Sequence, residues 1–316
     1  MPNFRDGSSS NTWPKVIPAV ALTLALSACS TSAGQTRDDA DRDSDRLLVL
    51  TTFTVIADMT ENVAADRVDV ASLTRPGAEI HGYEPTPDDL VRGQGADLVL
   101  ENGLGLETWF QQFTDRVDAP TAVLTDGIDT IPVASGGYEG EPNPHAWMSP
   151  DNALVYVDNI RDALTELDPE GEAEFAEAAE AYKEDITEVG AYLEAELAEV
   201  PEPARALVTC EGAFSYLARD AGLTEQYLWP VNAEREGTPQ QIAAVSEFVR
   251  DNDVPAVFCE STVNDSAQRS VIRETGAAMG ETLYVDSLSE PDGPVPTYLD
   301  LLRHDAEAIV AGLTGA

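Results

Sequence analysis

The sequence is poor in basic residues and has only three histidines and three cysteines. Its 18 lysines and arginines stand against 58 acidic residues, which gives a formal net charge of −40. A protein of this charge repels phosphate groups, so nucleic acid and acidic membrane surfaces are excluded as partners. The charge keeps the chain soluble and attracts cations diffusely. A specific cation site also needs ligands at defined positions, so the few histidines matter most.

Long hydrophobic runs are also missing. The main apolar stretch, Val16 to Ala28, follows two basic residues and is too short to span a bilayer as a mature helix. This pattern predicts a signal peptide over residues 1–28, and therefore a protein outside the cytoplasm. Residues 29–45 are polar and lack aromatic side chains, which predicts a disordered tether.

The signal peptide ends in Leu26-Ser27-Ala28-Cys29, which resembles the lipobox of bacterial lipoproteins. The resemblance implies that Cys29 becomes the lipid-bearing first residue of the mature protein. The alternative is a cleaved secretory signal with a chance cysteine, but the small residues directly before Cys29 favour the lipoprotein. We expect the protein to be attached to the outer face of the cytoplasmic membrane by this lipid alone. The alternative location is the periplasm.

The mature chain is organised around an acidic segment from Glu172 to Val200. Apolar residues recur there every three or four positions, as on one face of an α-helix. Prolines precede and follow the segment, which predicts one rigid helix of roughly 43 Å. A coiled-coil arm is the alternative, but the spacing does not hold a strict heptad. The apolar positions are Phe175, Ala179, Tyr182, Ile186, Val189, Leu193, Leu197 and Val200.

Short apolar runs alternate with helical patterns on both sides of this helix. The alternation predicts parallel sheets with helices on both faces. We therefore predict an α/β fold of two doubly wound lobes, residues 46–165 and 204–316, joined by a connecting helix at 166–203. The predicted strands are 47–53, 68–73, 97–100 and 122–124 in the first lobe, and 206–209, 227–231, 256–258 and 283–285 in the second.

Three predicted helices begin with a hydroxyl residue followed by proline, at Thr86-Pro87, Ser149-Pro150 and Thr238-Pro239. Two of the loops that end at these caps carry a histidine, His81 and His145. A single loop histidine is usually a solvated side chain. Two of them, each held between prolines ahead of a capped helix, indicate metal ligands, because a rigid loop lowers the entropic cost of binding.

Two carboxylates complete a possible ligand set. Glu211 and Asp286 each stand at the carboxyl end of a predicted strand in the second lobe, where ligands gather in parallel sheets. Either one alone could simply cap the following helix. His304 lies on the polar side of a terminal helix, and we expect it at the surface.

The ordered series of motifs resembles the metal-capturing solute-binding lipoproteins of bacterial ABC transporters, the manganese/zinc/iron group. The resemblance implies that His81, His145, Glu211 and Asp286 bind one divalent ion between the lobes, and that the protein, a monomer, serves a membrane permease with a cytoplasmic ATPase. Asn143 and Gly82 stand where many members carry acidic residues. The matching stretches are His81-Gly-Tyr-Glu-Pro-Thr-Pro-Asp88, Pro144-His145-Ala-Trp, Glu211-Gly-Ala-Phe, Glu236-Gly-Thr-Pro239 and Tyr284-Val-Asp286-Ser-Leu.

The ligand types favour a hard ion. Zinc-specific members typically carry a His-rich loop and a third histidine, whereas residues 136–142 contain none and the third ligand is Glu211. Carboxylate oxygens suit manganese better than imidazole-rich tetrahedral sites do. We predict Mn²⁺, with Fe²⁺ next, although Zn²⁺ has the higher intrinsic affinity.

Cys210 and Cys259 each precede a glutamate at a predicted strand end. If the second lobe has the strand order 2-1-3-4, the two sulfurs are neighbours. A disulfide that braces Glu211 and two buried thiols are both compatible with the sequence.

Two other functions remain open. A secreted metallohydrolase would use the same ligands but would need an open coordination position and a base, for which Glu260 is the nearby candidate. The second open function is that of a lipoprotein adhesin that binds a metal only incidentally.

Overall fold

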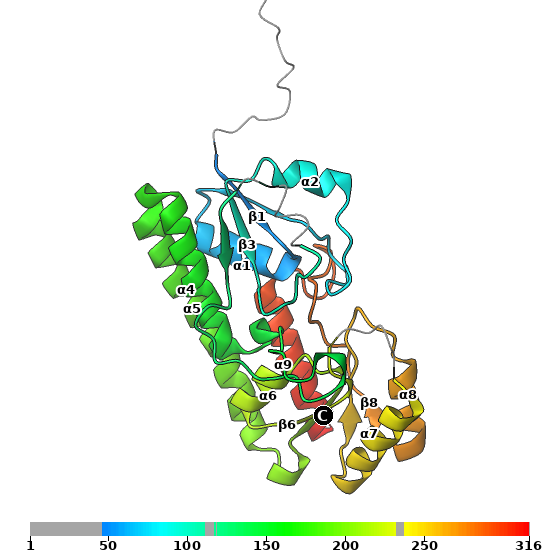
Figure 1. Ribbon diagram of the computed structural model, residues 1–316. Coiled ribbons are helices and arrows are strands. Elements are labelled where there is room, and N and C mark those ends of the chain that lie inside the picture. The colour runs from blue at the N-terminus through cyan, green and yellow to red at the C-terminus, as the bar shows by residue number, and fades with distance from the viewer. Residues whose placement is uncertain (1–45, 111–116, 118, 232–236, 316) are drawn as a thin grey trace, which may run out of the picture. The chain divides into compact units, whose positions relative to one another are not determined.

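A computed structural model of the protein describes residues 46–110, 117, 119–231 and 237–315 (Figure 1). Cys29 and the predicted signal peptide and tether lie outside the described residues. Residues Arg46–Ala316 form one compact unit. No helix in the described ranges is long and apolar enough to cross a membrane.

The two predicted lobes, residues 46–165 and 204–316, are called the first and second halves below. The first half contains a four-stranded parallel sheet, as the sequence predicts. Its strands are β1 (Leu48–Thr51), β2 (Asp69–Ser72), β3 (Leu98–Glu101) and β4 (Thr121–Val123), in the order β2-β1-β3-β4. Helices α1 (Thr54–Ala64) and α2 (Pro87–Gly93) follow β1 and β2.

Alternate residues of these strands face opposite ways, and both faces are covered. Val49 and Leu100 belong to the main core together with Ile56 of α1, whereas Leu50 and Val99 pack in a separate cluster. A strand that is buried on both faces needs continuous apolar residues, which explains the run that begins at Leu47.

The second half repeats the strand order, with two strands of six residues and two of only two residues. β5 (Ala206–Glu211) pairs with β6 (Thr224–Trp229), and β7 (Ala256–Val257) pairs with β8 (Ala278–Met279), all parallel. The Phe258 N–H donates to the Val208 carbonyl at 2.8 Å, which places β7 beside β5. The order is therefore β6-β5-β7-β8, the 2-1-3-4 arrangement. The helices are α6 (Ser215–Ala221), α7 (Pro239–Asp251), α8 (Ser266–Thr275) and α9 (Tyr298–Thr314).

One predicted strand is wrong. Leu283–Val285 forms only an isolated bridge, in which Leu283 pairs with Glu260. The ladder stops there because the Val285 carbonyl, the next acceptor on this side, accepts the Trp147 Nε1–H at 3.1 Å, and the Val263 N–H turns back to the Glu260 carbonyl. In addition, β6 begins three residues before the predicted start at Tyr227, and it ends before Pro230, which has no N–H to donate.

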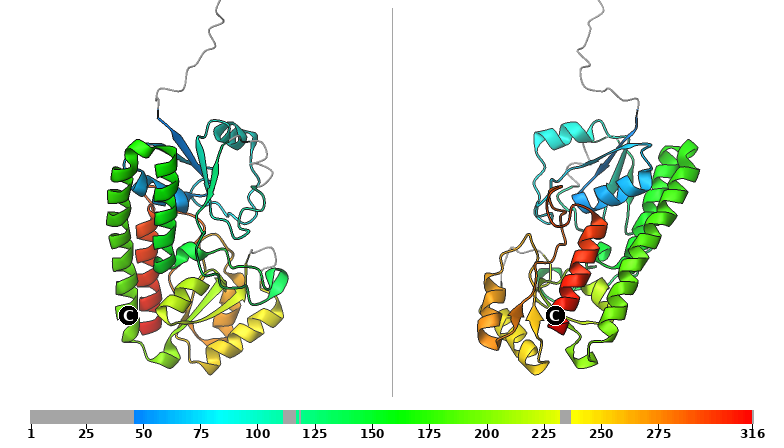
Figure 2. Two further views of the ribbon diagram at one scale, coloured as in Figure 1. Left: turned by 60° about the vertical axis from the view of Figure 1, so that its left-hand side comes forward. Right: turned by 180° about the vertical axis from the view of Figure 1, so that it is seen from behind.

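The long helix is confirmed as α5 (Glu172–Ala198). All eight predicted apolar positions are buried. The helix contacts α1 of the first half and α6 of the second, so it spans both. It also packs along α4 (Pro150–Leu167) and α9, and the views of Figure 2 show the three helices side by side. The helix is therefore supported along its length and is not a free strut.

The three predicted helix caps are confirmed. Thr86, Ser149 and Thr238 each accept a backbone N–H of the first turn through the side-chain oxygen. Thr238 also forms a capping box with Gln241, and Thr86 forms one with Asp89. These caps fix where the two histidine loops end.

Candidate metal site

The four predicted ligands converge. The Nε2 atoms of His81 and His145 lie 3.0 Å apart. Glu211 Oε1 lies 3.4 Å from His81 Nε2 and 4.0 Å from His145 Nε2, and Asp286 Oδ1 lies 4.0 Å from His81 Nε2. Donor atoms of His81, His145 and Glu211 therefore lie within 4.8 Å of one another, and Asp286 adjoins this group beside His81.

These separations fit a shared cation. Donor atoms about 2.0–2.2 Å from one ion lie roughly 3–4 Å from each other. Asp286 Oδ1 is buried and has no hydrogen-bond partner, although a buried acceptor is costly to leave unpaired. A cation held by the histidines would satisfy that oxygen.

Glu79 and Ser287 anchor the loop of His81. The Glu79 carboxylate accepts the N–H of His81 at 2.6 Å and the N–H of Gly82 at 3.1 Å. Gly77, at φ +76°, turns the chain so that its N–H reaches the Ser287 hydroxyl at 2.7 Å. The loop is thus tied to the segment that carries Asp286.

Glu79 itself belongs to the site and was missed from the sequence. One of its oxygens lies within 4.8 Å of donor atoms of His81 and Asp286. Its position two residues before His81 in the same Pro-Gly loop was the available signal. Because its oxygens already accept two backbone N–H groups, we assign it to shaping the loop.

Trp147 ties the His145 loop to the other half. His145 directly precedes the short 3-10 helix Ala146–Met148, and its ring packs 5.2 Å from the Trp147 ring. The Trp147 Nε1–H donates to the Val285 carbonyl at 3.1 Å, next to Asp286. The Tyr298 hydroxyl donates to the Trp147 carbonyl. His145 is fully buried as a result.

The carboxylates stand at the edge where the parallel strands of the second half end. Glu211 is the last residue of β5, and its N–H lies 3.3 Å from both carboxylate oxygens of Glu260. The Thr262 hydroxyl donates to Asp286 Oδ2 at 3.1 Å, and the other oxygen, Oδ1, is the one that lies 4.0 Å from His81 Nε2. Glu260 is buried, and its carboxylate accepts the backbone N–H of Glu211, a predicted ligand.

Burial opposes charge on these groups. It lowers the pKa of His81 from 6.5 to about 4 and that of His145 well below 6.5. It raises the pKa of Asp286 from 3.8 to about 7, with a further increase from the negative charge of Glu79. An incoming cation therefore meets two neutral imidazoles, the state in which they ligate metal.

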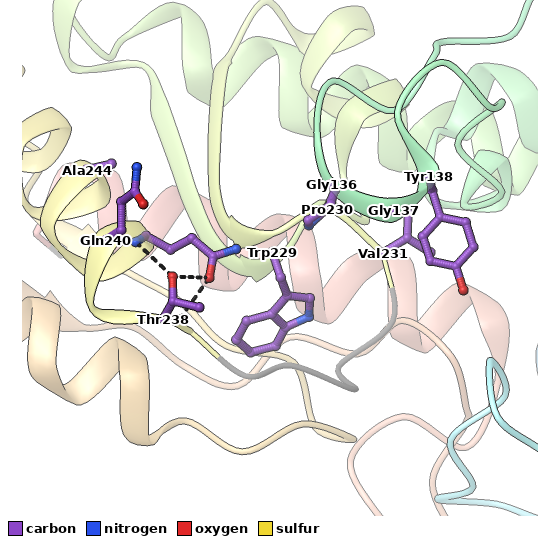
Figure 3. Close-up of a pocket in the computed structure, with 10 residues that line it drawn as sticks. Gly136, Gly137, Tyr138, Trp229, Pro230, Val231, Thr238, Gln240 and Ala244 are labelled. Atoms are coloured by element: carbon purple, nitrogen blue, oxygen red, sulfur yellow. Dashed lines mark hydrogen bonds between the residues drawn. The ribbon is translucent and has the colours of Figure 1, made fainter.

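The site is open on the side of His81. The side chains of His145, Glu211 and Asp286 are at most 2% exposed, whereas His81 is 5% exposed and borders a hollow of about 260 Å³. Leu104, Val133 and Tyr138 line this hollow. Tyr138 also borders a larger hollow of about 880 Å³, and Figure 3 shows Trp229 there beside the capped start of α7.

Cys210 and Cys259 lie on neighbouring strands. The structure joins them as a disulfide, with Cα atoms 4.9 Å apart, a separation that such a bond spans. Its formation in the protein stays a prediction. His304, in contrast, lies outside the site, where its Nε2 contacts the Thr282 carbonyl at 2.8 Å.

The fold is that of solved periplasmic metal-binding proteins. The Mn-bound periplasmic metal-binding protein from Candidatus Liberibacter asiaticus superposes with a TM-score of 0.80 at 40% sequence identity, over 85% of this chain and all of that one. The periplasmic zinc-binding protein TroA from Treponema pallidum gives 0.77 at 27% identity, over 85% of this chain and 99% of that one.

Sequence comparison gives the family. The family model described as ZnuA, zinc-uptake complex component A periplasmic, matches residues 49–312, and the chain belongs to this family. The chain is 47% identical to the iron-binding protein YfeA of Yersinia pestis over 295 residues, which are 93% of this chain and 95% of YfeA. It is 34% identical to the manganese-binding lipoprotein MntA of Halalkalibacterium halodurans, over 93% of this chain and 97% of MntA. The resemblance drawn from the motifs is confirmed.

Proposed function

We propose that the protein is an extracytoplasmic receptor that binds one divalent transition-metal ion and delivers it to an ABC-type importer. His81 and His145 would bind the ion through Nε2, and Glu211 and Asp286 through carboxylate oxygens. The observation that supports this most is the unpartnered, buried Asp286 Oδ1, which lies 4.0 Å from His81 Nε2, the nitrogen that lies 3.0 Å from His145 Nε2. The names of the relatives agree, since SsaB of Streptococcus sanguinis, 32% identical over 92% of this chain and 96% of SsaB, is called a metal ABC transporter substrate-binding lipoprotein.

Mn²⁺ is the cargo that we propose, with Fe²⁺ as the second candidate. The two carboxylates favour a harder ion than an all-imidazole site does. Fe²⁺ stays in consideration because the 47% identical relative YfeA is named iron-binding. Zn²⁺ would compete in vitro because its intrinsic affinity for such ligands is higher.

An enzymatic role has less support. A catalytic metal site keeps one position open and places a base beside it. Here four protein side chains would bind the ion, and the carboxylate of Glu260, the candidate base, accepts the Glu211 N–H.

Elemental analysis of protein purified from its native host tests the proposal. We expect about one transition-metal ion per wild-type chain, chiefly manganese, and almost none in His81→Ala and Asp286→Ala variants. Metal-free wild type, or variants that retain the wild-type content, would contradict it.

We also propose that Cys29 carries a lipid and that the protein acts as a monomer with a permease and its ATPase. A Cys29→Ala variant should leave the membrane fraction and keep its metal affinity. Sedimentation of the released protein should give the mass of one chain.

A further inference from the structure

Asn143 lies two residues before His145, and its backbone is fully engaged. The side chain and main chain are 3% exposed. Its N–H donates to the Ile131 carbonyl at 2.8 Å, and its carbonyl accepts the Tyr216 hydroxyl at 2.7 Å. These two backbone hydrogen bonds therefore fix the position of the residue independently of its side-chain amide.

The contacts of the amide fix its orientation. Its Oδ1 lies 3.0 Å from the backbone nitrogen of His145, which can only donate a hydrogen bond. Its Nδ2 lies 2.7 Å from the Gly212 carbonyl oxygen, which can only accept one. An exchanged amide would place two donors and two acceptors face to face, so only one orientation is compatible with both neighbours.

This orientation determines the tautomer of His145. Its Nδ1 lies 2.9 Å from Asn143 Oδ1, an acceptor, so Nδ1 carries the proton of the neutral ring. The other nitrogen, Nε2, then has a free lone pair, and it is the atom that faces His81 Nε2 at 3.0 Å. Asn143 therefore leaves the ligand atom of His145 available to a cation.

The same amide reaches the second half of the chain. Gly212, whose carbonyl it binds, directly follows the ligand Glu211. The Asn143 Nδ2 also lies 3.2 Å from the Ser215 hydroxyl oxygen. That hydroxyl donates to Glu225 on β6 at 2.6 Å. Hydrogen bonds thus run from the His145 ring to a buried carboxylate of the other sheet.

We propose that Asn143 is a positioning residue that orients one ligand from each half, His145 and Glu211. It holds His145 as the Nδ1–H tautomer and fixes the peptide next to Glu211, so that both ligands are in place before the ion arrives. The inference rests on the proposed function. A purely structural asparagine would need only its backbone contacts, whereas both ends of this amide act on a ligand or on its neighbour.

The tautomer can be measured without any variant. Long-range ¹H–¹⁵N correlation spectra of the metal-free protein resolve the nitrogens of its three histidines. We expect the proton of neutral His145 on Nδ1. A proton on Nε2 would overturn the proposal, whether or not the protein binds metal.

Two variants measure the effect on Mn²⁺ affinity. Asn143→Ala should lose the single tautomer and bind Mn²⁺ about 10–100-fold more weakly, as loss of a hydrogen bond to a metal-ligating histidine does. Asn143→Asp keeps the acceptor for Nδ1–H, so it should keep the tautomer and bind more tightly than Asn143→Ala. Thr238→Ala, which removes the cap of α7 away from the site, is the matched control and should bind as wild type does.

The outcomes separate this inference from the proposed function. Wild-type affinity in Asn143→Ala, or equal losses in the alanine and aspartate variants, would overturn the positioning role. Wild type that binds no Mn²⁺, Fe²⁺ or Zn²⁺ would instead contradict the proposed function.

Discussion

The two halves of the protein offer different chemistry to the same point. The first half supplies two neutral imidazoles from loops, at His81 and His145. The second supplies carboxylates, one at the end of β5 and one after an isolated bridge, at Glu211 and Asp286. Strand ends are fixed by their sheet, whereas loop residues need added anchors, which Glu79 and Asn143 provide.

This difference explains why neither half alone should bind a divalent ion. Two buried imidazoles bring no charge to balance a divalent ion, and burial raises the pKa of Asp286 to about 7, so this carboxyl is only partly ionised at neutral pH without a cation. A cation at the shared point lets the carboxylate ionise and gives the imidazole lone pairs a partner. Ligand binding should therefore couple the two halves.

Removal of one ligand from either half should have the largest effect. His81→Ala removes a nitrogen donor, and Asp286→Asn removes a charge with little change of shape. We expect both to weaken Mn²⁺ binding by more than about 100-fold, because loss of an outer hydrogen bond alone costs about 10–100-fold. Competition against a fluorescent chelator measures this.

His304→Ala is the matched control, since it removes a histidine that lies outside the site. It should keep the wild-type affinity. Wild-type binding in either ligand variant would show that the two halves do not share one ion.

Metal should stabilise the folded chain through both halves. At a free Mn²⁺ concentration of 100 times Kd, the free energy of unfolding should increase by about 2.7 kcal/mol. Thermal unfolding with and without Mn²⁺ measures the change. The increase should vanish in both His81→Ala and Asp286→Asn; an increase that survives in one of them would assign the ion to the other half alone.

The metal-free protein should become less stable as the pH rises from 6.5 to 8. Burial raises the pKa of Glu107 in the first half to about 7, and those of Glu225 and Glu260 in the second to about 7 and 8. The folded chain then keeps protons that the unfolded chain has lost, so stability falls with pH, by at most about 1.4 kcal/mol per group and pH unit.

The histidines do not oppose this trend in that range. Their lowered pKa values in the folded state make the protein more stable as the pH rises toward 6.5, and this contribution is complete above it. Bound Mn²⁺ should reduce or reverse the fall above pH 6.5, because it requires ionised Asp286. Urea unfolding at each pH tests both states, and a metal-free stability that rises from pH 6.5 to 8 would contradict the prediction.

The smallest effects should come from the two capping boxes. Thr86→Ala and Thr238→Ala should each reduce the free energy of unfolding by about 1 kcal/mol. Only Thr86→Ala should also weaken Mn²⁺ binding, because the Thr86 cap fixes the end of the His81 loop. Equal Mn²⁺ affinities in the two variants would show that this cap does not position the ligand.

Local patterns predicted the elements that depend on local sequence. The spacing from Phe175 to Leu197 gave the long helix, and the caps at Thr86 and Ser149 gave the helix starts after the two histidine loops. The four site residues came from loop position and strand ends, helped by the family resemblance.

Features that depend on distant contacts were missed. Val285 and its neighbours look like a strand, but Trp147, far away in the chain, donates to the Val285 carbonyl that a longer ladder would use. The role of Glu79 depends on how its loop folds back on His81. Asn143 was visible in the motif, yet its bond to Gly212 exists only because the two halves pack together.

Anomalous diffraction from crystals of the Mn²⁺-loaded protein, collected at the manganese edge, tests the central claim most directly. We predict one peak within bonding distance of His81 Nε2, His145 Nε2 and carboxylate oxygens of Glu211 and Asp286. A peak elsewhere, or one bound by residues of a single half, would contradict the account.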